Sequence, residues 1–122
     1  MLIEPMRRAW MEVDCRALRA NYAAVTKRIP AGCGVLPMVK ANGYGVGVSL
    51  AIESLKALQP WGFGVATLEE GLEVRANGWD GPIVVFTPTT PADLPDLVAH
   101  GLEPVVSRDD ALRACADFGR AR

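Results

Sequence analysis

One stretch of the chain decides how it folds, and it reads Val35-Leu36-Pro37-Met38-Val39-Lys40-Ala41-Asn42-Gly43-Tyr44-Gly45-Val46-Gly47. The apolar run predicts a buried strand over 35–40, and the alternating glycines predict a tight loop directly after it. A strand that delivers one amine to its carboxyl end, beside a closely approaching backbone, can hold a carbonyl cofactor covalently. Lys40 is therefore a candidate catalytic residue, and the alternative is an exposed lysine at the end of a strand.

Further apolar runs follow along the chain, at 61–66, 82–86 and 103–106. The intervals between them are long enough for one helix each. Near-continuous apolar character is typical of strands covered on both faces, as in parallel sheets. Repeated strand–loop–helix units predict an α/β fold, which is either about half of a (β/α)₈ TIM-type barrel or an open doubly wound sheet.

Capping side chains mark the expected helix starts. After an extended segment at 8–13, Asp14 predicts the start of a helix that ends before Pro30. The apolar residues Leu18, Tyr22, Val25 and Ile29 are expected to share one face of this helix. Three later starts each pair a hydroxyl side chain with an acid three residues on: Thr67 with Glu70, Thr90 with Asp93 (Pro91 between them as first helical residue), and Ser107 with Asp110.

Composition excludes several classes of protein. The net charge of -1 provides no field to attract nucleic acid or an anionic membrane, so neither partner is expected. The sequence shows neither a signal-peptide pattern nor an apolar run of membrane-spanning length, which predicts a cytoplasmic protein. Cys15, Cys33 and Cys115 are widely spaced and only His100 could join them, so no metal site is predicted.

Two other interpretations of the glycine-rich loop fail on spacing. Gly43, Gly45 and Gly47 do not have the spacing of a dinucleotide-binding loop, and a Walker loop places its lysine after the glycines rather than before them. The glycines more simply bend the chain so that the Tyr44 hydroxyl can act as a donor to a phosphate group. Packing is the alternative role for this tyrosine.

The stretch at 40–47 resembles the pyridoxal-phosphate signature of the alanine racemases, the fold type III enzymes. The stretches at 10–14, 63–71 and 82–86 are similar to that family as well. The resemblance implies that Lys40 carries pyridoxal 5'-phosphate and that Tyr44 contacts the cofactor's phosphate. The chain departs from the usual signature in having Gly43 where alanine is common and Val46 where histidine is common.

Other charged and aromatic residues receive smaller roles. Phe86, at the end of the third strand, is expected either to line the cofactor pocket or to pack in the core. Glu69 and Glu70 both suit the first turn of a helix and are assigned no catalytic role. His100 before Gly101 is expected to complement the end of a helix.

The resemblance also sets the expected scope of the chain. A complete barrel needs about 250 residues, so residues 1–122 are expected to be the amino-terminal half of the racemase barrel domain, without its second half and the β domain. The family's second base, a tyrosine, and the arginine beside its pyridine nitrogen have no counterpart here. The expected reaction is interconversion of L- and D-alanine by a homo-oligomeric full-length enzyme, with this chain inactive alone. The alternatives are a racemase for another small amino acid such as serine, or a non-catalytic self-assembling half-barrel or cofactor-binding module.

Overall fold

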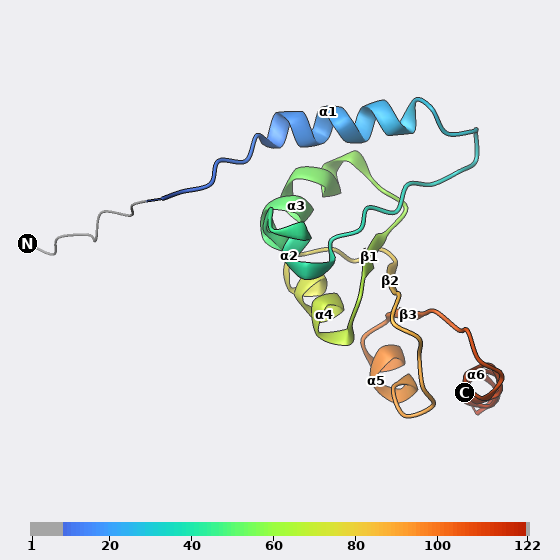
Figure 1. Ribbon diagram of the computed structural model, residues 1–122. Helices are drawn as coiled ribbons and strands as arrows, with labels where there is room; N and C mark the ends of the chain where they lie inside the picture. The colour runs from blue at the N-terminus through green and yellow to red at the C-terminus, as the bar shows by residue number, and fades with distance from the viewer. Residues whose placement is uncertain (1–8, 122) are drawn as a thin grey trace, which may run out of the picture.

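The computed structural model describes residues 9–121, so the predicted extended segment at 8–13 falls within it only from residue 9. Helices and short strands alternate over most of this length (Figure 1). In chain order the elements are Cys15–Thr26 (α1), Lys40–Tyr44 (α2), Val48–Leu55 (α3), the 3₁₀ turn Lys56–Leu58 (η1), Phe63–Val65 (β1), Leu68–Ala76 (α4), Ile83–Val85 (β2), Leu94–Ala99 (α5), Glu103–Pro104 (β3) and Asp109–Arg120 (α6).

The strands form one parallel sheet in the order β1-β2-β3, which confirms the predicted α/β fold. Phe63 lies opposite Ile83, and Val84 lies opposite Glu103. The strands are shorter than their apolar runs. The last run, predicted as a strand over 103–106, pairs as a strand only at Glu103–Pro104.

The first predicted strand, 35–40, needs correction. Its chain runs parallel to β1, and Met38 forms an isolated bridge with Gly64. The Val39 N–H donates to the Gly64 carbonyl at 2.8 Å, and the Gly64 N–H donates to the Pro37 carbonyl at 2.9 Å. Pro37 has no N–H to extend the ladder, and Lys40 is already the first residue of α2. Lys40 therefore follows the paired segment directly rather than ending a strand.

The core lies between the sheet and the helices α3, α4 and α5, which line one side of it in Figure 1. Phe63 and Val65 of β1 are completely buried on this side, and the Phe63 ring meets the Trp79 ring edge-on with centroids 5.0 Å apart. Side chains alternate along a strand, so Gly64 faces the other side. A side chain at Gly64 would collide with Met38 and would come within 3.1 Å of the Phe86 ring.

Two of the predicted helix starts are confirmed. The Asp14 carboxylate accepts hydrogen bonds from the Arg16 and Ala17 amides at the start of α1. The Thr67 hydroxyl accepts from the Glu70 amide at the start of α4. The predicted face of α1 is only partly correct, because Val25 is 48% exposed and the helix ends at Thr26.

The other two predicted starts are wrong in position. At the first, Asp93 does bind Thr90 as predicted, but the Thr90 hydroxyl donates to Asp93 instead of capping an amide. Asp93 accepts from the Thr90 N–H and hydroxyl at 2.8 and 2.7 Å, which closes a turn at 91–93 and delays α5 until Leu94. At the second, Asp110 pairs with Arg108 instead of Ser107, and it binds both ends of the Arg108 guanidinium, at 2.9 and 2.8 Å. A bidentate ion pair of this kind is stronger than a cap formed by a neutral hydroxyl group. Helix α6 begins at Asp109, and the residue that precedes it is Arg108 and not Ser107.

Candidate active site

Lys40 is the first residue of a short turn at the carboxyl end of the sheet, and the residues after it have a left-handed backbone conformation. Ala41 (φ 50°, ψ 50°), Asn42 (φ 53°, ψ 48°) and Gly43 (φ 63°, ψ 36°) are all left-handed, and Tyr44 and Gly45 also have positive φ. Only glycine, and to a lesser degree asparagine, adopts this region without cost. The predicted tight loop after Lys40 is confirmed, but two of its left-handed positions carry ordinary side chains, at Ala41 and Tyr44.

The loop satisfies its own backbone groups. The Gly45 amide donates to the Ala41 carbonyl, the Gly47 amide to the Asn42 carbonyl at 2.9 Å, and the Val46 amide to the Gly43 carbonyl. The Asn42 side chain accepts from the Val48 amide at 2.9 Å, at the start of α3. These amides are therefore already engaged, and the glycines shape the loop rather than offering free N–H groups to a ligand.

This turn brings the side chains of Lys40 and Tyr44 together. The Lys40 Nζ lies 5.8 Å from the centroid of the Tyr44 ring, within cation–π range. Tyr44 is 64% exposed and Lys40 is half-buried. Within residues 9–121 no carboxylate forms a salt bridge with the Lys40 amine. The amine of half-buried Lys40 therefore lies near the ring of an exposed tyrosine.

Phe86 directly follows β2, and its N–H donates to the Val65 carbonyl at 2.9 Å. Its ring lies over Gly64, next to Met38, on the side that faces away from the helices. Phe86 is 44% exposed, so it is a surface-lining aromatic rather than a member of the core.

Glu70 is a residue of this site that the sequence analysis left without a role. Its carboxylate accepts from the Ala41 amide at 2.8 Å and from the Ala66 amide at 2.6 Å. Partial burial raises the pKa of Glu70, but hydrogen bonds from the Ala41, Ala66 and Thr67 amides and the positive charge of Lys40 outweigh burial and hold that pKa below its usual value. The carboxylate is thus charged at neutral pH and joins the end of β1 to the turn after Lys40. The predicted Thr67–Glu70 capping pair was the signal for it, because the acid of such a pair reaches back toward the strand.

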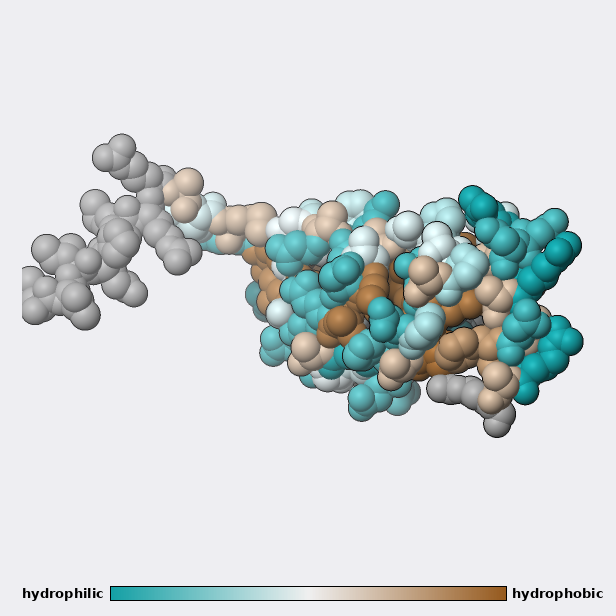
Figure 2. All heavy atoms as spheres, turned by 90° about the horizontal axis from the view of Figure 1, so that it is seen from below, coloured by the Kyte–Doolittle hydropathy of each residue, from teal (hydrophilic) through white to brown (hydrophobic). Residues whose placement is uncertain are grey.

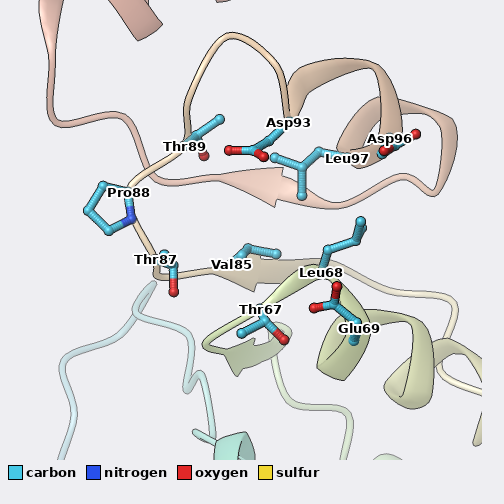
Figure 3. A pocket seen from close by; sticks show the side chains of 10 residues that line it. All are labelled: Thr67, Leu68, Glu69, Val85, Thr87, Pro88, Thr89, Asp93, Asp96 and Leu97. Atoms are coloured by element: carbon cyan, nitrogen blue, oxygen red, sulfur yellow. The ribbon is translucent and has the colours of Figure 1, made fainter.

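A cavity at the same edge of the sheet has a different lining. It encloses about 220 Å³ between the loop after β2 and the helices α4 and α5 (Figure 3). The hydroxyl side chains of Thr67, Thr87 and Thr89 line it together with the apolar side chains of Val85 and Leu97. None of the predicted site residues, Lys40, Tyr44 and Phe86, lines this cavity.

The remaining sequence predictions concern metals, thiols and His100. Residues 9–121 contain no group of three or more potential metal ligands. All of the cysteines are free thiols, with Cys33 exposed and Cys15 and Cys115 half-buried. His100 lies at the carboxyl end of α5, before the left-handed Gly101, as predicted. In this part of the chain no helix has the length and apolar character needed to cross a membrane.

Comparison with known proteins shows to which family the chain belongs. The family model described as "Alanine racemase, N-terminal domain" matches residues 13–122. The chain belongs to the alanine racemase family. It is 36% identical over 114 residues to the alanine racemase of Levilactobacillus brevis, covering 93% of this chain and 31% of that protein. It is 40% identical over 103 residues to the alanine racemase of Symbiobacterium thermophilum, covering 84% of this chain and 27% of that protein.

Solved structures of alanine racemases share the fold. The Acinetobacter baumannii enzyme superposes with a TM-score of 0.78 at 31% identity, over 89% of this chain and 32% of that chain. The Bacillus anthracis enzyme with bound L-Ala-P gives a TM-score of 0.79 at 26% identity, over 92% of this chain and 30% of that chain. A histidine racemase from Leuconostoc mesenteroides shares the fold at 22% identity and a TM-score of 0.75. The chain spans from a fifth to about a third of the length of the curated alanine racemases it matches.

Proposed function

We propose that Lys40 binds pyridoxal 5'-phosphate covalently and that this chain is the cofactor-binding part of an enzyme that interconverts L- and D-alanine. The observation that carries the proposal is the left-handed turn after Lys40, which brings the Lys40 amine within 5.8 Å of the centroid of the Tyr44 ring. Membership of the alanine racemase family supports the reaction and the substrate. The chain's own residues support the attachment point.

The residues present fit the cofactor through their side chains. The Lys40 amine can condense with an aldehyde and release water, since no carboxylate of the described residues pairs with it. The Tyr44 hydroxyl can donate to a phosphate oxygen. Phe86 offers an exposed aromatic surface. The loop amides are engaged within the loop, so the phosphate's remaining donors must come from outside it.

Racemisation requires the α-proton to leave from one face of the amino acid and return to the other. When bound, the cofactor delocalises the negative charge left on Cα. Lys40, released from its covalent bond by the incoming amine, would remove or return the proton on its own face. The opposite face needs a second base, for which we assign no residue among 9–121. We therefore infer that the chain binds the cofactor but does not racemise alanine alone.

We further infer that the chain associates with copies of itself or with the rest of a barrel. A half-barrel exposes unpaired strand edges and an apolar inner surface. Trp61 and Phe86 are 54% and 44% exposed, and apolar side chains also reach the surface between polar ones when the molecule is viewed from below (Figure 2). Covering such side chains would stabilise an assembly.

The test of the proposed function is chemical labelling. Pyridoxal phosphate added to the chain should produce a visible absorption band, and borohydride should then fix the label on Lys40. Lys27 and Lys56 are internal controls, because both are more exposed than Lys40 and lie outside the turn. Peptide mapping by mass spectrometry should find Lys40 labelled in preference to both. Equal labelling of all these lysines, or an unchanged band in Lys40→Ala, would show that the assignment is wrong.

A further inference from the structure

We propose that Glu70 is a positioning residue that fixes the direction of the Lys40 side chain by tying the left-handed turn to the end of β1. The inference rests on the proposed role of Lys40. Glu70 itself touches neither the Lys40 amine nor the place where a substrate would react. It acts through the backbone amides of Ala41 and Ala66.

The turn needs such a tie because its backbone conformation is costly. A left-handed residue with a side chain costs about 1–2 kcal/mol relative to the right-handed form, and Ala41 and Tyr44 both adopt positive φ. Strained positions persist only where the surrounding structure over-determines them. Ala41 directly follows Lys40, so relaxation of Ala41 to negative φ would rotate the peptide that carries the lysine.

Glu70 is well placed to supply this restraint. One carboxylate oxygen binds the Ala41 amide at 2.8 Å, and the other binds the Ala66 amide at 2.6 Å. The Ala41 amide lies in the turn and the Ala66 amide directly follows β1, and Ala41 and Glu70 are 29 residues apart in the chain. Asn42, by contrast, binds the Val48 amide at the start of α3 and does not connect the turn to the sheet. Glu70 therefore joins the turn to the end of β1.

The neighbouring acid provides a matched control. Glu69 also lies in the first turn of α4 and carries the same charge, but it is exposed and binds neither Ala41 nor Ala66. Glu69→Gln therefore reproduces the loss of charge at the helix start without loss of the tie. Glu70→Gln keeps the shape of the side chain but places an amide NH₂ against one of the two N–H groups. Glu70→Ala removes both hydrogen bonds.

Two measurements on the 122-residue chain test the role. The first is amide hydrogen exchange without cofactor, with the Phe86 amide in the sheet as reference. Exchange of the Ala41 amide should become about fivefold or more faster in Glu70→Ala, as expected for the loss of one or more hydrogen bonds, and should stay unchanged in Glu69→Gln. The second is the rate of borohydride-trapped pyridoxal phosphate labelling at Lys40 relative to Lys56. That ratio should fall about fivefold in Glu70→Ala, less in Glu70→Gln, and not at all in Glu69→Gln.

The outcomes separate this inference from the proposed function. If the unchanged chain labels Lys40 no faster than Lys56, the proposed function fails and the positioning role fails with it. If the unchanged chain prefers Lys40 and both Glu70 variants keep that preference, only the positioning role is overturned. An equal loss of preference in Glu69→Gln would also overturn it, because the effect would then belong to the helix start. Unchanged Ala41 exchange in Glu70→Ala would show that no tie exists.

Discussion

Helix α4 holds the sheet together at both ends, with an acid at one end and a base at the other. Glu70, in its first turn, accepts from backbone amides at the carboxyl edge of the sheet, beside Lys40. Arg75, in its last turn, donates to backbone carbonyls at the amino edge. Its guanidinium binds the carbonyls of Trp79 at 2.8 Å, Gly81 at 2.6 Å and Gly101 at 2.7 Å.

The two ends differ in what they hold. Arg75 fixes the chain just before β2 and β3, where the only left-handed residues nearby are glycines, at Gly78 and Gly101. Glu70 fixes a turn in which Ala41 and Tyr44 are left-handed despite their side chains. In barrels of this kind the amino edge serves stability and the carboxyl edge serves chemistry. Left-handed residues with side chains therefore lie in the segment that Glu70 holds and not in the two segments that Arg75 holds, although Gln59, in the chain before β1, is also left-handed.

The largest expected effect on stability comes from removing the hydrogen bonds that Arg75 donates at the amino edge of the sheet. Arg75→Met keeps much of the side chain's length but removes the charged donor, which leaves the half-buried carbonyls of Trp79 and Gly81 and the exposed carbonyl of Gly101 without it. We expect the free energy of unfolding to fall by about 2 kcal/mol, the scale of hydrogen bonds to a charged group. Denaturant unfolding measures the loss, and Arg113→Met, at an exposed position of α6, is the control. Lys40 labelling should be preserved in the fraction that remains folded. A selective loss of Lys40 labelling would contradict the division between the two edges.

The next effect is at the carboxyl edge and depends on pH. The folded-state pKa of Glu70 is held below its model value of 4.5, so its charged form stabilises the fold at neutral pH. This contribution is fully present above the unfolded-state pKa and is lost as pH falls through the folded-state pKa. Glu70→Gln should therefore lower the free energy of unfolding by about 1 kcal/mol at pH 7. The difference in the free energy of unfolding between the unchanged chain and Glu70→Gln should shrink below about pH 4. A constant difference from pH 7 to about pH 3 would show that the charge of Glu70 is not involved.

Much of this arrangement could be predicted from the sequence, and the exceptions have physical causes. The Asp14 and Thr67 caps and the loop after Lys40 depend on residues close together in the chain, and the parallel sheet followed from the repeated alternation of apolar runs with helix-length intervals. The late start of α5 follows from the hydrogen bonds between Asp93 and Thr90, which here close a turn before the helix instead of starting the helix at Thr90. The contacts of Glu70 with Ala41 and of Arg75 with Gly101 span 29 and 26 residues. Such contacts depend on how the strands pair, which spacing along the chain does not reveal.

The smallest expected effects form a matched pair of glycine exchanges, one at each edge. Ala41→Gly removes about 1–2 kcal/mol of left-handed strain but gives the unfolded chain more freedom, at a cost of about 0.5–1 kcal/mol. The net result should be a gain in stability of about 0.5 kcal/mol. Gly78→Ala should give the opposite sign. A methyl group has room at Gly78, where the nearest atom is the Lys56 Nζ at 3.9 Å, but the φ of 78° is unfavourable for alanine.

The denaturant midpoints of the two variants test whether the backbone is more strained at the carboxyl edge of the sheet than at the amino edge. The comparison requires that the variants share the same dependence of the free energy of unfolding on denaturant concentration. If Ala41→Gly stabilises the chain while Gly78→Ala destabilises it, the carboxyl edge holds strain that the amino edge has avoided by using glycine. The stabilised Ala41→Gly chain should nevertheless label Lys40 more slowly, since the more flexible residue loosens the peptide that orients the amine. If Ala41→Gly instead loses as much stability as Gly78→Ala, the turn after Lys40 is not strained, and the reason for a tie through Glu70 disappears.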